Sequence, residues 1–330
     1  MNSFLVGLGY SRVQPSDIRV LNMRLSSMAG IPPEIGSSLV SLALLCIDAC
    51  PRLTELPESL CLLRTLEIIV IKDCNALTAL PQSLGRLQTL TTLTLSACMD
   101  ITALPESIGL LSALKLLEVT SCKSISTIPD SVCQLSGLLL LNLSFCDRIA
   151  RLPESLGKIR TLRRLRLTGC EALTRLPESL GALEMLNVLS VEGCTSLTSL
   201  PESLGQLSAL KELNLNCCRA LTVIPDSAGL LYSLEMIWLI RCIALTRLPE
   251  SLCQLENIHT FSVYNLKGMT SPPQSMLNNH CWPNVRPYLY DRYTALKLLL
   301  LVAAGGWRSR TRLPRELIAS IQSRFMIESN

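Results

Sequence analysis

The chain has 330 residues, of which 48% are hydrophobic, 4% aromatic and 17% charged, and its formal net charge is +4. This hydrophobic content excludes an intrinsically disordered chain, and the scarcity of aromatic residues requires a core of aliphatic side chains. The mild charge does not favour nucleic-acid binding. The N-terminus shows no secretion signal, and the longest apolar run, Leu298 to Ala304, is far shorter than the ~20 residues of a membrane helix. We therefore expect a cytoplasmic protein without a membrane partner.

A repeat of 24 residues organises the chain from Val20 to about Leu266. Two residue types mark it, each returning nine times without a slip in spacing. The prolines are Pro57, Pro81, Pro105, Pro129, Pro153, Pro177, Pro201, Pro225 and Pro249, and the cysteines are Cys50, Cys74, Cys98, Cys122, Cys146, Cys170, Cys194, Cys218 and Cys242. A period of this length is typical of solenoid proteins, in which each unit stacks on the next.

One unit, Leu200 to Val223, reads LPESLGQLSALKELNLNCCRALTV. Its ladder L-xx-L-xx-L-x-L-xx-C is the leucine-rich-repeat pattern. The alternation in Leu213-Asn214-Leu215 predicts a short strand with one buried face, and such strands would pair as a parallel sheet on the concave side. The segment PESLGQL predicts a short convex helix with Pro201 at its first position. We expect an α/β horseshoe solenoid of about eleven repeats with a small helical C-terminal cap.

The cysteine of each unit stands where leucine-rich repeats carry Asn or Cys. A small, weakly polar side chain can pack there, inside the turn that follows the strand. The chain has no CxxC pair that would suggest zinc, and a disulfide at every rung would have no unique partner. The column therefore predicts a stack of buried free thiols, which fits a reducing compartment.

The consensus LPESLGxLxxLxxLxLxxCxxLTxLPESLG resembles the repeat domain of plant intracellular disease-resistance receptors of the nucleotide-binding leucine-rich-repeat type. It is also similar to leucine-rich-repeat effectors of plant-pathogenic bacteria. The resemblance covers about three quarters of the chain and implies partner recognition in plant defence or signal transduction. The GxxxxGK[ST] phosphate loop of a complete receptor is missing from the sequence, so no ATP-dependent switch is expected in this chain.

Because the repeat phase is known, the outward positions of the concave sheet can be assigned. The central column is Cys46, Val70, Thr94, Glu118, Asn142, Arg166, Ser190, Asn214, Trp238 and Ser262. Around it, Arg163, Arg164 and Arg166 would project from the concave side and its edge. They indicate a docking point for an acidic segment or a phosphate. The alternative is a solvated face whose charge is neutralised by glutamates on nearby rungs, namely Glu118, Glu184 and Glu192.

A second outward group follows near the C-terminal end of the repeats. The residues Met236, Trp238 and Ile240 are left facing outward, and Tyr264 lies one rung further on. An exposed tryptophan among apolar groups is typical of an interface anchor, although the same group could instead contact a C-terminal cap. The rest of the concave face is expected to be small and polar, with Thr92, Thr94, Ser96, Thr120, Ser144 and Ser190.

The expected domains are an N-terminal cap segment at 1–19, the repeats at 20–266, and a C-terminal loop with two helices at 267–330. Capping is the simplest role for that tail, since a terminal repeat exposes its core. Within it, LPRELIASI faintly resembles the adaptor-binding helices of ubiquitin-ligase substrate receptors. The alternative function is therefore a substrate-recognition subunit or effector linked to a ubiquitin ligase.

Catalytic patterns are missing from the sequence. The two histidines, His259 and His280, have no acid or nucleophile at useful spacing, and no GxSxG or HExxH motif occurs. We therefore expect no enzyme activity, no cofactor and no metal site. The main prediction is a monomeric module that binds protein partners through its concave face, and a further hypothesis is an acidic ligand or nucleic acid at the arginine cluster.

Overall fold

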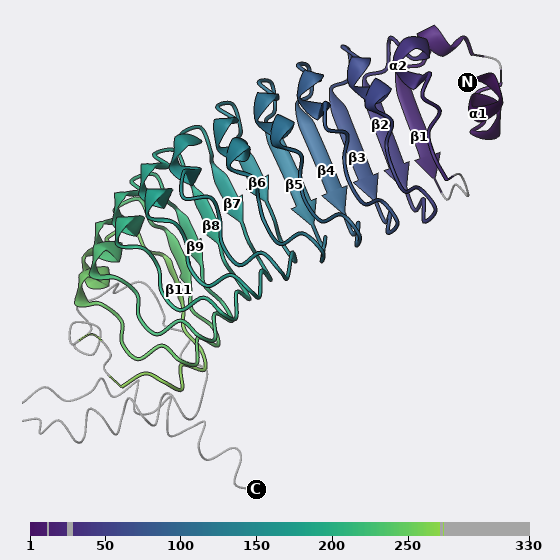
Figure 1. The fold of residues 1–330 in the computed structure, drawn as a ribbon. Helices are drawn as coiled ribbons and strands as arrows, with labels where there is room; N and C mark the ends of the chain where they lie inside the picture. Colours follow the sequence, from purple (N-terminus) through teal and green to yellow (C-terminus); the bar gives the residue numbers. More distant parts are fainter. Residues whose placement is uncertain (12, 25–28, 271–272, 274–330) are drawn as a thin grey trace, which may run out of the picture. The chain divides into compact units, whose positions relative to one another are not determined.

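The computed structural model describes residues 1–11, 13–24, 29–270 and 273. Eleven strands form one parallel sheet in which each strand pairs with its neighbours in sequence order (Figure 1). They are β1 (Val20–Arg24), β2 (Leu44–Asp48), β3 (Ile68–Lys72), β4 (Thr92–Ser96), β5 (Leu116–Thr120), β6 (Leu140–Asn142), β7 (Arg164–Arg166), β8 (Val188–Ser190), β9 (Glu212–Asn214), β10 (Met236–Trp238) and β11 (Thr260–Ser262). Leu93 pairs with Leu117, as every residue pairs with the one 24 positions later. The predicted horseshoe solenoid is confirmed.

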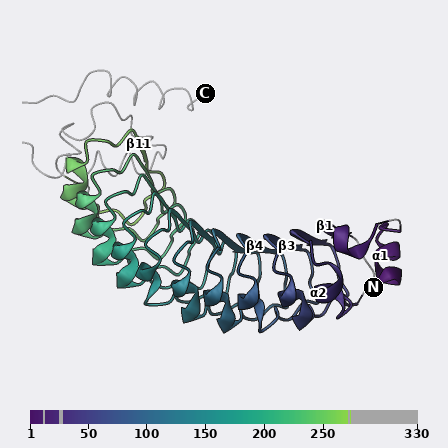
Figure 2. The same cartoon turned by 90° about the horizontal axis from the view of Figure 1, so that it is seen from above.

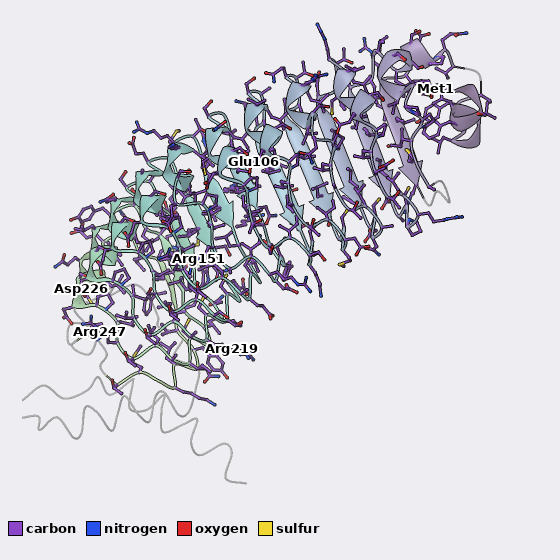
Figure 3. The ribbon with its side chains drawn as sticks, in the orientation of Figure 1. Met1, Glu106, Arg151, Arg219, Asp226 and Arg247 are labelled. Carbon is purple, nitrogen blue, oxygen red and sulfur yellow. The ribbon has the colours of Figure 1, made fainter. Side chains whose placement is uncertain are left out.

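Short helices line the outer side of the curved sheet (Figure 2). They are 3-10 helices, with the exception of the single turn α2 (Ile35–Ser38). They comprise η2 (Glu58–Leu62), η3 (Leu84–Arg86), η4 (Glu106–Leu110), η5 (Asp130–Gln134), η6 (Leu156–Lys158), η7 (Glu178–Ala182), η8 (Glu202–Gln206), η9 (Asp226–Leu230) and η10 (Glu250–Gln254). Acidic residues such as Glu106 and Asp226 begin them (Figure 3).

The expected position of the proline was wrong by one residue. Pro201 has an extended backbone with ψ of 148° and precedes the helix as its N-cap, so Glu202 is the first helical residue. Of the inward leucines, Leu204 lies in this helix, Leu207 is its C-cap and Leu210 follows it.

A glycine column lets successive helices approach one another. A Cβ atom at Gly109 or Gly205 would overlap the carbonyl oxygen of the serine in the next repeat, Ser131 or Ser227. Cysteine replaces this glycine at Cys61, Cys133 and Cys253.

The helices in the repeats after Cys61 and Cys133, η3 and η6, contain three residues, whereas the other helices from η2 to η10 contain five.

The core runs the full length of the sheet. In one repeat Leu204, Leu207, Leu210, Leu213, Leu215, Cys218 and Leu221 are all completely buried. Burying each leucine contributes about 1.5–3 kcal/mol relative to leaving it exposed. The nine cysteines of the column are likewise buried free thiols, as expected. Burial raises the pKa of Cys194 to about 12, so this thiol stays protonated at neutral pH and donates to the Leu167 carbonyl at 3.2 Å.

The two ends of the chain differ in what can be described. At the start, α1 (Asn2–Gly7) buries Phe4 and Leu5 against the core, and η1 (Pro15–Asp17) leads into β1. The predicted domain boundaries after residues 19 and 266 stay predictions. The two expected C-terminal helices and LPRELIASI lie outside the described residues. No helix within the described ranges is long and apolar enough to cross a bilayer.

Candidate binding surface

Strand register brings the predicted central column together on the concave face. Asn142 pairs with Glu118 and Arg166, and Arg166 pairs with Ser190. Leucines such as Leu165 alternate with these residues and are fully buried, so the column points away from the core. The chain period alone was sufficient to predict this arrangement.

We number each rung of the solenoid by its strand, so that rung seven contains β7. The three arginines of rung seven, Arg163, Arg164 and Arg166, are all exposed. Arg164 lies between Leu140 and Val188, and Arg166 between Asn142 and Ser190. None of the three arginines takes part in an ion pair within the part of the chain that the structure describes.

Two nearby carboxylates accept hydrogen bonds from asparagine side chains. Glu118 accepts a hydrogen bond from the Asn142 amide at 3.2 Å, and Glu192 accepts one from Asn214 at 2.9 Å. The arginine side chains therefore present positive charge that neighbouring rungs do not pair directly.

The N-terminal half of the concave face is more apolar than expected. A column two positions before the central column is half-buried and includes Leu44, Ile68, Leu116 and Leu140, with Thr92 interrupting it. Val70 lies beside it in the central column. The expectation of a small and polar face holds for Thr92, Thr94 and Ser96 but was wrong for this apolar column. The sequence pattern contained the signal, because each of these residues stands at an outward position of the repeat.

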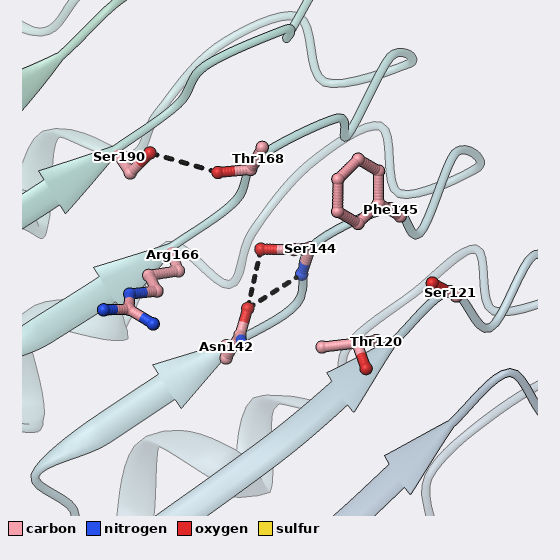
Figure 4. Close-up of a pocket in the computed structure, with 8 residues that line it drawn as sticks. All are labelled: Thr120, Ser121, Asn142, Ser144, Phe145, Arg166, Thr168 and Ser190. Carbon is pink, nitrogen blue, oxygen red and sulfur yellow. Dashed lines mark hydrogen bonds between the residues drawn. The ribbon is translucent and has the colours of Figure 1, made fainter. Parts of the chain in front are cut away.

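A hollow of about 460 Å³ opens on the concave face beside this column (Figure 4). It is lined by Thr120, Ser121, Asn142, Ser144, Phe145, Arg166, Thr168 and Ser190. The Ser144 hydroxyl and backbone N–H both donate to Asn142 Oδ1, at 2.7 and 3.1 Å. The Thr168 and Ser190 hydroxyls share one hydrogen bond of 3.1 Å. Arg166 is the one charged residue of this lining.

Phe145 was not among the residues predicted from the sequence. Its ring is 52% exposed and its backbone has a φ of +61°. The left-handed conformation recurs just before each repeat cysteine, where small residues or glycines such as Gly169 and Gly193 are common. It costs a residue with a side chain roughly 1–2 kcal/mol. A bulky aromatic residue at a strained, exposed position is a signal of function, and the position could have been found from the repeat phase.

The second predicted group lies on and beside β10. Met236, Trp238, Ile240 and Tyr264 are all half-buried and alternate with the buried Ile237 and Leu239, as the sequence indicated. At the edge of the same rungs Lys211 and Glu235 form an ion pair of 2.7 Å, and His259 lies 3.7 Å from the other Glu235 oxygen. The structure thus presents two separate groups on the concave side, one basic and one aromatic.

The described residues contain no group of three His, Cys, Asp or Glu side chains arranged to hold a metal ion. His259 bonds the neighbouring Thr260 hydroxyl at 3.1 Å, in addition to its contact with Glu235. His280 lies outside the described residues.

Known proteins resemble the chain in its repeats. Residues 152–281 match a family model described as a leucine-rich repeat region. The curated proteins contain no sequence match.

Three solved structures share the fold. A leucine-rich-repeat protein of Leptospira interrogans has a TM-score of 0.52 and 22% identity, over 82% of this chain and 84% of the other. The leucine-rich repeat domain of the type III effector XopL has a TM-score of 0.53 and 26% identity, over 74% of this chain and 76% of the domain. A chain of the Drosophila Toll–Spatzle complex has a TM-score of 0.56 and 22% identity, over 73% of this chain and 34% of its own.

These similarities agree with the geometry of the sheet, its period and its buried ladder. Leucine-rich-repeat folds generally mediate protein–protein interaction and are typically not enzymes. The chain therefore has the leucine-rich-repeat fold, a horseshoe solenoid of parallel strands.

Proposed function

We propose that this protein recognises a protein partner through its concave face, as a non-enzymatic module of intracellular signalling or defence. The observation that carries the proposal is the set of exposed arginines on rung seven, Arg163, Arg164 and Arg166, without ion-pair partners among the described residues. Exposed guanidinium groups bind carboxylate or phosphate in a forked geometry. The partner would therefore bring an acidic group to this rung.

The aromatic group adds apolar contact area to the same face. Trp238 is half-buried among Met236, Ile240 and Tyr264 and can lose further solvent contact when a partner binds. Tryptophan and arginine are the residue types that most often dominate interface energetics. We propose that rung seven steers and orients the partner, while rung ten anchors it.

The role in defence has separate support. The similarity to the repeat domain of a type III effector covers most of both chains. This similarity, together with the sequence resemblance to plant disease-resistance receptors, supports defence as the proposed setting. The ubiquitin-ligase alternative rests on LPRELIASI, which lies outside the described residues.

Affinity capture from the source cells tests the proposal. The wild type is compared with a variant carrying Arg163→Glu, Arg164→Glu and Arg166→Glu, and with Trp238→Ala. A matched control reverses three exposed arginines on or near the convex helices, Arg64, Arg86 and Arg160. We expect each concave variant to weaken capture of the same protein at least tenfold, while the control retains it.

Thermal unfolding of every variant accompanies the capture. A concave variant that keeps its Tm but loses the partner supports recognition at this face. If the concave variants capture every partner as well as the control does, the concave face is not the binding surface.

A further inference from the structure

The hollow at rungs five to eight offers hydrogen-bond donors that the fold does not use. The Arg166 guanidinium has no side-chain partner among the described residues, and neither has the Ser121 hydroxyl. The Thr168 and Ser190 hydroxyls use one hydrogen between them, so one hydroxyl hydrogen remains available. A group made only of acceptor oxygens would satisfy all of these donors.

Phe145 gives the hollow an aromatic rim. Its ring contacts Gly169 of the next rung, where a Cβ atom would lie 2.6 Å from a carbon of the ring. Glycine at that position therefore makes room for the ring beside the hollow (Figure 4). The ring is neither buried in the core nor required by the backbone, which would adopt its left-handed turn more easily with glycine.

The charges around the hollow favour an anion. Arg164 lies on the same strand as Arg166 and faces the same side. Glu118 on β5 and Glu192 after β8 do not line the hollow, and each accepts a hydrogen bond from an asparagine amide. A dianion gains more from two neighbouring arginines than a single carboxylate does.

We propose that this hollow binds a phosphorylated tyrosine of the partner protein, with the phosphate at Arg166 and the phenyl ring against Phe145. The site rests on the proposed function and names the chemistry that its basic rung recognises. A hollow of about 460 Å³ is much larger than a phosphate group alone, which leaves room for an aromatic ring. Offset or edge-to-face packing on Phe145 would select tyrosine phosphate over serine phosphate.

The apolar column explains how the rest of the partner would lie. Leu140 and Leu116 follow directly from rung seven toward the N-terminus, and Ile68 and Leu44 continue the line beyond Thr92. Rungs are about 4.8 Å apart, so the five steps from β7 to β2 span roughly 24 Å, the length of about seven extended residues. The partner segment is thus a phosphotyrosine flanked on one side by apolar residues.

Ligand-observed NMR with the full chain tests the site. The probes are N-acetyl-phosphotyrosine amide, N-acetyl-phosphoserine amide, N-acetyl-tyrosine amide and inorganic phosphate. We expect the phosphotyrosine probe to bind at least tenfold more tightly than each of the others. Equal binding of inorganic phosphate would reduce the site to an anion site and overturn the assignment, as would the absence of phosphotyrosine binding.

Two substitutions separate a binding role from a structural one. Phe145→Gly removes the ring and relieves the left-handed strain, so we expect an unchanged or higher Tm together with a tenfold or greater loss of phosphotyrosine affinity. Arg166→Gln should lose at least tenfold as well. Arg160→Gln serves as the matched control because Arg160 is exposed near the convex helices and does not line the hollow, and it should retain the affinity.

The outcomes also separate this site from the proposed function. If Phe145→Gly binds phosphotyrosine as the wild type does, the site is wrong. If, in addition, the variant with Arg163→Glu, Arg164→Glu and Arg166→Glu still loses the captured partner, recognition by the concave face stands. The partner then binds rung seven through another acidic group.

Discussion

The first five rungs and the later rungs are built from one repeat but end their strands differently. Strands β1 to β5 have five residues each, whereas β6 to β11 have three. In two of the shorter strands an asparagine of the central column accepts a hydrogen bond from the backbone N–H two residues later. Asn142 does so from Ser144 at 3.1 Å, and Asn214 from Asn216 at 3.0 Å.

Such local bonds compete with the strand ladder. Val70 and Thr94, at the same position in the longer strands, lack an amide oxygen for this contact. The core leucines do not differ in kind between the two halves. The local asparagine bond thus accompanies the short strands β6 and β9, whereas β7, β8, β10 and β11 are equally short without an asparagine at this position.

The buried thiols follow the same division. From Cys146 onward the thiol donates to a carbonyl 27 residues earlier, at 3.2 Å for Cys170 and 3.0 Å for Cys242. In the first half, Cys98 is 3.9 Å from the corresponding carbonyl, and Cys74 donates instead to its own strand end. Shortening the strands brings each thiol closer to the preceding rung.

The largest effect should come from truncating the shared core. Leu93→Ala in β4 and Leu189→Ala in β8 remove equivalent, fully buried side chains. We expect each to lower the free energy of unfolding by about 2–5 kcal/mol, and by similar amounts, because both leave a cavity in the same packing. Urea unfolding measures the free energy of unfolding of both variants. If the loss in one variant is less than half of the loss in the other, the two parts of the chain do not share one kind of core.

The glycine column should give a somewhat smaller effect. Gly109→Ala and Gly205→Ala each bring a methyl group against the next repeat's serine carbonyl. We expect losses of about 1–3 kcal/mol in thermal unfolding, as for overpacking generally. Gly30→Ala, where a Cβ atom meets nothing within 4 Å, is the control and should change little. Unchanged stability in both variants would contradict the close packing of the glycine column against the next repeat.

The strand-end comparison can be tested directly with Asn142→Val. Without the amide oxygen, β6 should lengthen toward five residues, and the Ser144 amide should become more protected in hydrogen exchange. The net change in unfolding free energy should stay within about 1 kcal/mol, since one local hydrogen bond is exchanged for ladder bonds. Unaltered exchange at Ser144 would show that the asparagine does not set the strand end.

The smallest effect should come from the convex carboxylates. Glu58 accepts hydrogen bonds from the Gln82 and Ser83 amides and from the Ser83 hydroxyl, whereas Glu178 accepts one, from the Ser203 amide. The Ser83 hydroxyl is the main cause that holds the pKa of Glu58 below its usual value. Because the folded pKa is lowered, the stabilisation is complete above the ordinary carboxyl pKa and is lost as the pH falls through the folded pKa.

We therefore expect Glu58→Gln to cost up to about 0.5 kcal/mol at pH 7, given the exposure of this carboxylate, and less at pH 3. Glu178→Gln should cost less than Glu58→Gln at pH 7. The two variants are compared by thermal unfolding at both pH values. A Glu58→Gln cost that grows toward pH 3 would contradict the assigned direction of the pKa change.

Most of the sheet was predictable because contacts between rungs repeat at a constant sequence separation. Once the period of 24 was known, the strand partners of Leu93 or Arg166 were found by adding or subtracting 24. The burial of Cys194 was predicted from its place in the repeat. The helix type was not predicted, because Leu204, Leu207 and Leu210 can face inward from an α-helix or a 3-10 helix.

The binding surface, too, was only partly predictable from the sequence. The sequence by itself determined which residues leave the core, since a strand has two faces and one is filled by leucine. The tertiary structure decided which of them act together. Phe145 and Gly169 are 24 residues apart, and neither indicates that the ring of one rests on the other to border a hollow beside Arg166. That arrangement depends on backbone conformation and on hydroxyl pairing across rungs, which no repeat pattern encodes.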